Sequence, residues 1–216
     1  MFTRFSNKQT TQKSIAGEEI PLPEVKKDSH TSIEKALLER RSVRSYTDQA
    51  IELVEVGQLL WAAQGVNRTG GYRTAPSAGA LYPLEIYLLV GKAEGLSAGL
   101  YHYLPEYHAL KIIQAGDKRV ALSEAALNQE AIKEAPVVIV ITAIYQRTKR
   151  KYGQRGEQYV HMEVGSATQN VYLQAISLGL GTVFIGAFYD DQVQAVLGLP
   201  KEEIPLCLMP VGDPAE

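Results

Sequence analysis

Three arginines and a serine stand close together between residues 40 and 44, and they are the first candidates for chemistry in this sequence. They are Arg40, Arg41, Ser42 and Arg44. Guanidinium groups bind phosphate oxygens through paired hydrogen bonds, and a neighbouring hydroxyl supplies a further donor. The same composition suits a solvated helix end, because arginines there complement the helix dipole. The segment alone supports both interpretations about evenly.

A second candidate is the loop at residues 74–83, which contains Pro76, Ser77, Ala78 and Gly79. Small residues between two prolines make a rigid loop whose backbone can approach a flat ring closely. A loop that only reverses the chain uses the same residue types. On composition alone, that simpler interpretation is favoured.

Two further segments are weaker candidates. Gly186 and Ala187 lack bulky side chains, so their N–H groups could donate to an electron-rich ring atom. A buried strand between two turns explains the segment 179–188 more simply. Lys151 and Tyr152 belong to a basic run between predicted helices, which is usually a solvated surface. A lysine beside a tyrosine can nevertheless supply an acid and a base next to a bound substrate.

Composition and missing motifs argue against several functions. The net charge of -2 gives no reason to expect a nucleic acid or an anionic membrane as partner. The sequence contains no P-loop and no nucleophile elbow, and its glycines do not form a dinucleotide-binding fingerprint. Its four histidines lack metal-ligand spacing and Cys207 is its single cysteine, so we expect neither a metal site nor a disulfide. Without an apolar signal segment, we expect a soluble, cytoplasmic protein.

The hydrophobic pattern predicts one α+β domain at residues 29–216, preceded by an extended polar arm at 1–28. Apolar positions at helical spacing predict helices that include residues 33–39, 56–63, 120–127, 158–178 and 190–197. Short apolar and β-branched runs predict strands at 84–90, 100–104, 109–113, 136–141, 182–188 and 205–211. Strands that alternate with helices but include a hairpin favour a mixed β-sheet flanked by helices.

In their order along the chain, the four segments resemble the nitroreductase superfamily. The resemblance rests on Arg-Arg-Ser-x-Arg after the first helix, a loop with Pro-Ser, and Gly-Leu-Gly-Thr followed by Gly-Ala, and it covers residues 33–212. Three longer strings resemble its SagB-type branch, which includes azoline oxidases that act on ribosomally made peptides. They are Pro-Ser-Ala-Gly-Ala-Leu-Tyr-Pro at 76–83, Gly-Leu-Tyr-His-Tyr at 99–103 and Lys-Tyr-Gly-x-Arg-Gly at 151–156.

The resemblance implies a nitroreductase-like α+β fold, assembled as an intertwined homodimer with FMN bound across the interface. Arg40, Arg41 and Ser42 would then hold the FMN phosphate and ribityl chain. Arg44 would reach the pyrimidine edge of the flavin. A cation near N1 and O2 stabilises the reduced anionic flavin, so Arg44 would also tune the reduction potential.

The same resemblance gives roles to the other segments. The loop at 76–79 would come from the other subunit and lie along the flavin ring. The N–H groups of Gly186 and Ala187 would address the N5 and O4 side of that ring. The long helix at 158–178 would lie at or near the dimer interface.

Lys151 and Tyr152 match the pair that azoline oxidases use in catalysis. Azoline dehydrogenation removes a proton from carbon while a hydride leaves to flavin N5, and either side chain would serve as the base. The substrate would be a small molecule or a peptide. Two alternatives remain from the sequence: a broad NAD(P)H-dependent nitro or quinone reductase, and a protein that stores or senses FMN without turnover.

Two departures from the family pattern affect these expectations. Many members carry a basic residue after the last strand, whereas this sequence has an acidic segment at 213–216, so we expect weaker FMN binding. Azoline oxidases are also often longer than this chain and work with partner proteins. A compact chain of this kind is also consistent with a reductase that acts alone.

Overall fold

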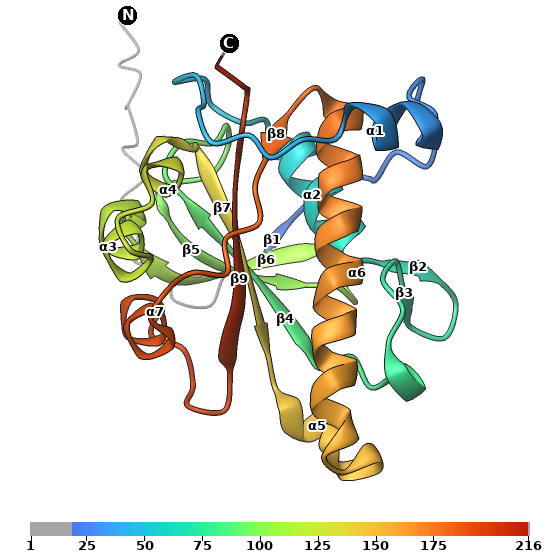
Figure 1. Ribbon diagram of the computed structural model, residues 1–216. Coiled ribbons are helices and arrows are strands. Elements are labelled where there is room, and N and C mark those ends of the chain that lie inside the picture. Colours follow the sequence, from blue (N-terminus) through green and yellow to red (C-terminus); the bar gives the residue numbers. More distant parts are fainter. Residues whose placement is uncertain (1–18, 216) are drawn as a thin grey trace, which may run out of the picture.

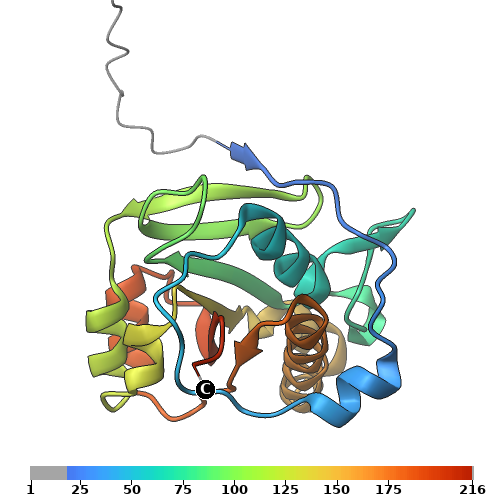
Figure 2. The ribbon, with the colours of Figure 1, turned by 90° about the horizontal axis from the view of Figure 1, so that it is seen from above.

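The computed structural model describes residues 19–215, which form a seven-stranded sheet with helices on both faces (Figure 1, Figure 2). The strand order is β1-β6-β5-β4-β7-β9-β8, and every neighbouring pair is antiparallel. The strands are Glu19–Pro21 (β1), Leu84–Val90 (β4), Gly99–Leu104 (β5), Ala109–Ala115 (β6), Val137–Ala143 (β7), Gly181–Thr182 (β8) and Ile204–Gly212 (β9). A separate hairpin joins Val66–Arg68 (β2) to Tyr72–Arg73 (β3). The predicted α+β class is confirmed.

Helices cover the sheet in two groups (Figure 2). Helices α2 and α6 lie over one face, and α3, α4 and α7 lie over the other. Their bounds are Ile33–Glu39 (α1), Leu53–Gln64 (α2), Arg119–Ala125 (α3), Glu130–Glu134 (α4), Tyr145–Tyr152 (α5), Arg155–Leu178 (α6) and Asp190–Leu197 (α7). A short 3-10 turn lies at Ala78–Ala80. No helix within residues 19–215 is long and apolar enough to cross a membrane.

The central strand β7 shows why the sheet needs cover on both faces. Ile139 and Ile141 face the core under α2 and α6, whereas Val138 and Val140 face the core under α3, α4 and α7. Successive side chains of a strand point to opposite faces. A continuous apolar run is therefore buried on both sides, as the sequence predicted for this segment.

Helix α6 crosses one face of the sheet with the apolar side that the sequence predicted. The buried positions include Val160, Val164, Ala167, Val171 and Ala175. The helix ends at Gly179, whose φ of +77° gives it the left-handed conformation that glycine adopts at helix ends.

The described end of the predicted arm packs against the domain of its own chain. Residues 1–18 lie outside the described residues. Strand β1 pairs with β6, and the N–H of Leu22 donates to the carbonyl of His108 at 3.0 Å. The N–H of Lys26 then donates to Gln58 Oε1 at 2.9 Å. Residues 19–26 therefore pack against the sheet edge and α2.

Two local expectations are wrong. Residues 182–188 do not form a continuous strand, because β8 ends at Thr182 and the N–H of Phe184 donates to the side chain of Tyr172. Pairing resumes only at an isolated bridge between Ile185 and Leu208. The basic run at 149–152, expected between helices, instead forms the last turn of α5.

Glu203 is a buried carboxyl that ties the segment between α7 and β9 to the sheet. Its Oε2 accepts hydrogen bonds from Tyr87 Oη at 2.8 Å and Thr142 Oγ1 at 3.1 Å. Burial, together with this carboxylate, raises the pKa of the Tyr87 hydroxyl far above its usual value. The Tyr87 hydroxyl therefore acts as a fixed donor.

We expect Tyr87→Phe to lower the free energy of unfolding by about 1.5–3 kcal/mol, the range for a hydrogen bond to a charged group. The ring stays in place, so the stacking of residue 87 on His102 at 4.7 Å is preserved. Urea unfolding measures the change. Tyr107→Phe is the matched control, because this tyrosine is 72% exposed. Equal stability of both variants would contradict the role of the Glu203 contact.

Candidate functional site

The predicted site residues form two clusters at different levels of α6. The arginine cluster contains residues 40–44 and the segment 181–187, and lies near the C-terminal half of the helix. The lysine–tyrosine cluster contains loop 76–83 with Lys151 and Tyr152, and lies near its N-terminal half. Figure 1 shows α1 and β8 at one end of α6 and α5 at the other.

Main-chain pairing aligns the two segments of the arginine cluster. Ser42 forms a parallel bridge with Thr182, and the N–H of Val43 donates to the Thr182 carbonyl at 2.9 Å. Gly181 permits this approach, because a Cβ placed there would lie 2.7 Å from the Val43 side chain. The first and third candidate segments are therefore neighbours in space.

Tyr172 of α6 joins the same two segments through its hydroxyl. Its Oη lies 3.3 Å from Ser42 Oγ and accepts the N–H of Phe184 at 2.7 Å. The guanidinium carbon of Arg40 lies 5.2 Å from the centre of the Tyr172 ring, which favours a cation–π contact. The motifs contain no signal for Tyr172, because its partners come from distant parts of the chain.

Arg40 and Arg41 border a hollow of about 570 Å³ at the chain's C-terminal segment. Its lining includes Arg40, Arg41, Leu180 and Pro214. Arg41 and Arg44 are exposed. A cationic surface with exposed guanidinium groups beside a serine hydroxyl suits a phosphate.

Gly186 and Ala187 form an exposed loop at the end of this cluster. Within residues 19–215, neither of their N–H groups donates a hydrogen bond to the protein. They therefore remain available to a ligand. No group of three or more metal-ligating side chains occurs among the described residues 19–215.

Loop 76–83 has a strained backbone. Gly79, Ala80 and Tyr82 have φ values of +63°, +55° and +44°. Left-handed conformations of non-glycine residues cost free energy and persist only where the surroundings impose them. The loop therefore depends on the contacts that hold it.

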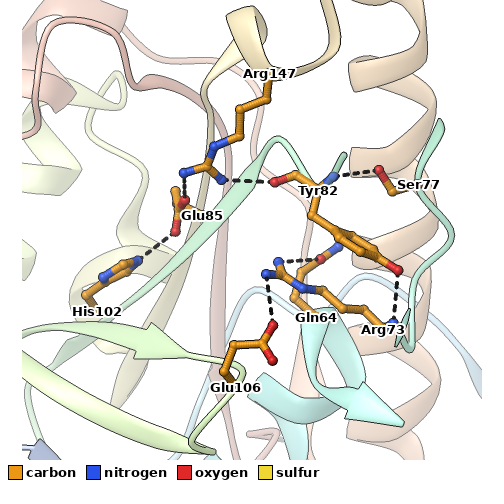
Figure 3. Close-up of polar contacts among 8 residues, drawn as sticks. All are labelled: Gln64, Arg73, Ser77, Tyr82, Glu85, His102, Glu106 and Arg147. Carbon is orange, nitrogen blue, oxygen red and sulfur yellow. Dashed lines mark hydrogen bonds and ion pairs between the residues drawn. The ribbon is translucent and has the colours of Figure 1, made fainter. Parts of the chain in front are cut away.

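Tyr82 is held at its N–H, its carbonyl, its hydroxyl and its ring (Figure 3). Its N–H donates to Ser77 Oγ at 2.9 Å, and its carbonyl accepts from Arg147 Nη1 at 2.9 Å. Its hydroxyl accepts the N–H of Arg73 at 3.2 Å, and the Arg73 guanidinium lies 4.5 Å from its ring centre. These contacts hold Tyr82 in its left-handed conformation.

Arg147 connects the loop to the sheet and to α5 (Figure 3). Its guanidinium forms an ion pair with Glu85 of β4, whose other oxygen lies 2.8 Å from His102 Nε2. Burial acts to raise the pKa of Glu85, but the hydrogen bond with His102 and the charge of Arg147 outweigh it and lower that pKa. An ionised Glu85 thus anchors the helix that carries Lys151 and Tyr152.

Lys151 and Tyr152 converge on Gly79. A Cβ placed on Gly79 would lie 2.8 Å from Tyr152 Oη and 3.0 Å from Lys151 Nζ. Lys151 Nζ lies 5.4 Å from the Tyr152 ring centre, and that ring meets Tyr159 edge-on at 5.1 Å between centres. The second and fourth candidate segments therefore form one cluster.

Glu163 belongs to the lysine–tyrosine cluster and was not among the sequence candidates. It is buried on α6, and its Oε1 accepts the N–H of Ala78 at 2.8 Å. Its position beside Val164 in an apolar helical pattern is a signal that could have identified it, because charged residues are rarely buried without a partner.

The two clusters do not meet within one chain. Glu163 and Tyr172 mark their positions on α6 and are nine residues apart. At a rise of 1.5 Å per residue, this separates them by about 14 Å along the helix axis. A site that uses both clusters together therefore needs a ligand that spans them or a second chain.

Residues 37–213 match the model of the nitroreductase family. A protein of Methanocaldococcus jannaschii that is named as a nitroreductase is 48% identical over 194 residues, which cover 90% of this chain and 96% of that protein. The microcin B17-processing protein McbC of Escherichia coli is 31% identical over 147 residues, covering 65% of this chain and 54% of that protein. This chain thus matches about half the length of McbC.

Two further similarities agree with this assignment. An FMN reductase (NADPH) of Bacillus subtilis is 26% identical over 195 residues, covering 84% of this chain and 65% of that protein. A solved structure of a protein from Ralstonia eutropha, also named as a nitroreductase, has a TM-score of 0.82 at 31% identity, covering 92% of this chain and 90% of that chain. From the matched residues and from relatives that align over nearly the whole chain, this protein belongs to the nitroreductase family of oxidoreductases.

Proposed function

We propose that this protein is an FMN-dependent oxidoreductase of the SagB-type branch, which acts as a homodimer on a small-molecule or peptide substrate. The observation that carries the proposal is the convergence of Lys151 and Tyr152 on Gly79. Two side chains able to exchange protons thus lie at the loop expected to border the flavin. Similarity to McbC, a peptide-processing protein, supports the choice of branch.

The arginine cluster supports FMN as the cofactor. Arg40 and Arg41 line the hollow and, with Ser42 next to them, suit the phosphate, and the exposed Arg44 follows two residues later. The free N–H groups of Gly186 and Ala187 suit acceptor atoms of the ring. When bound, FMN supplies a two-electron acceptor at N5. The chain's own part is to orient the substrate and to take its proton at Lys151 or Tyr152.

Separation of the two clusters supports a homodimer. A second copy would bring loop 76–83 of one chain to the arginine cluster of the other. Exposed apolar side chains on α1 and α6 offer a surface for this contact. They are Ile33, Leu37, Leu38 and Met162, with exposed fractions of 54%, 54%, 85% and 60%. Burying such side chains is the usual driving force of subunit association.

A second candidate function is an NAD(P)H-dependent nitro or quinone reductase. It is favoured by the name of the relative that is 48% identical, and by similarity to an FMN reductase that uses NADPH. In this case the nicotinamide and the electron acceptor would occupy the same place in turn. Lys151 and Tyr152 would then orient a substrate rather than remove a proton from carbon.

An absorbance spectrum of the purified protein, followed by anaerobic titration with NADPH, separates these functions. We expect a yellow protein that NADPH bleaches poorly and that a peptide containing a thiazoline bleaches. Rapid bleaching by NADPH with reoxidation by a nitroaromatic would favour the reductase instead. A colourless protein that also refuses added FMN would contradict both functions.

Arg44→Ala should weaken FMN binding by ~1–3 kcal/mol, because the flavin loses the charged hydrogen-bond donor that the Arg44 guanidinium would supply. Quenching of FMN fluorescence measures the dissociation constant. Lys111→Ala is the control, since Lys111 is an exposed cation on β6 and tests the loss of charge alone. Equal affinity of both variants would remove Arg44 from the site.

Lys151→Met and Tyr152→Phe test the proton-transfer role. Loss of a general base lowers turnover by about 10²–10⁴-fold. We expect such a loss in at least one variant for oxidation of the thiazoline peptide, with normal FMN content. Arg150→Met is the matched control, because this exposed cation lies on the same helix. Full activity of both test variants would leave the pair without a catalytic role.

A further inference from the structure

Glu163 is a buried carboxyl group that the roles proposed above do not use. The residue is 5% exposed. Its Oε1 accepts the N–H of Ala78 at 2.8 Å, whereas Oε2 is buried and has no hydrogen-bond partner among the residues that the structure describes. Buried polar atoms in native proteins nearly always have a partner. An unpartnered carboxyl oxygen therefore points to a ligand group.

The surroundings of Glu163 suit the edge of a flat ring. They form a hollow of about 270 Å³. Whole ligand pockets are larger, at about 300–1,000 Å³, so this hollow suits part of a ligand. Three of its lining residues belong to the loop assigned to the flavin, and α6 supplies the rest. The lining consists of Pro76, Ser77, Ala78, Tyr159, Met162, Glu163 and Ser166.

The charge state of Glu163 depends on its partners. Burial raises the pKa of its carboxyl, and the Ala78 N–H and the neighbouring Ser77 hydroxyl offset this only in part, although Ser77 forms no hydrogen bond with Oε2. Of the ionisable groups nearby, Lys151 and Tyr152 lie at Gly79 of the same loop, and Tyr159 lines the hollow. No ion pair joins Glu163 to a cation within residues 19–215. A donor that reached Oε2 would favour the ionised carboxyl.

We propose that Glu163 positions loop 76–83 through Ala78 and presents Oε2 as the acceptor for an N–H group of the bound flavin ring, so that FMN binding releases a proton from this carboxyl. The inference rests on the proposed function, which assigns the loop to the flavin. One oxygen of Glu163 thus holds the strained loop, while the other accepts a hydrogen bond from the ligand. An isoalloxazine ring carries one such donor, its imide N–H.

The proton linkage is tested by FMN affinity at about pH 5–8, a range above the usual pKa of glutamate. Affinity of the wild-type protein should rise with pH relative to Glu163→Gln, by up to about tenfold per pH unit, the limit for one proton. Glu124→Gln, an exposed carboxyl on α3, should keep the wild-type slope. The FMN phosphate titrates in this range too, so only differences between variants count. Parallel slopes for wild type and Glu163→Gln would overturn the linkage.

The positioning role is tested without flavin, by amide hydrogen exchange of the peptide that covers residues 76–83. Glu163→Ala should speed exchange at Ala78 by about tenfold or more, because the N–H loses its acceptor. Glu163→Gln should stay near wild type, since its amide oxygen can accept the same N–H. Equal exchange in wild type and Glu163→Ala would overturn this role.

The two measurements also separate this inference from the proposed function. A wild-type protein that binds no FMN refutes the proposed function and the proton linkage together. Normal FMN binding with parallel pH slopes refutes the linkage alone. The exchange experiment judges the loop contact in either case.

Discussion

Burial of one side of α6 against the sheet is the constraint on which both clusters depend. Val160, Val164 and Val171 lie on the side that faces the sheet core, and each buried aliphatic side chain contributes about 1.5–3 kcal/mol. This packing fixes the rotation of the helix about its axis. Because one residue position corresponds to a rotation of about 100°, a shift of one position would turn Glu163 away from Ala78 and Tyr172 away from Ser42.

Loop 76–83 shows how a strained segment is kept rigid. Three left-handed residues within four positions would open if they were free, yet contacts from β3, α5 and α6 hold the loop on several sides. Arg147 lies about one helical turn before Lys151 on α5, so the contacts that fix Arg147 also fix the part of the helix that carries Lys151. The shape of the loop and the position of the proposed base therefore share one anchor. Such preorganisation allows a site to meet its ligand without reordering.

Local sequence patterns predicted most elements because their causes are local. Strand β7 is a continuous β-branched run, and α6 repeats apolar residues at helical spacing. The prediction of a continuous strand at 182–188 is wrong. Val183, Phe184 and Ile185 favour strands by residue type, whereas the N–H of Phe184 donates to the hydroxyl of Tyr172. The contacts of Glu163 with Ala78 and of Tyr172 with Ser42 join residues 85 and 130 positions apart. No local pattern encodes such contacts. From the sequence, only the resemblance to family motifs could indicate the residues of the site.

The pairing of Ser42 with Thr182 also affects how the sheet meets other molecules. Open sheet edges invite strand addition and aggregation, and short or covered edges prevent it. Strand β8 is only two residues long, and residues 42–43 cover its outer side through the Val43 hydrogen bond. At the opposite edge, β1 adds three residues that shield the longer β6. The segment proposed to bind phosphate therefore also guards the protein against edge-to-edge self-association.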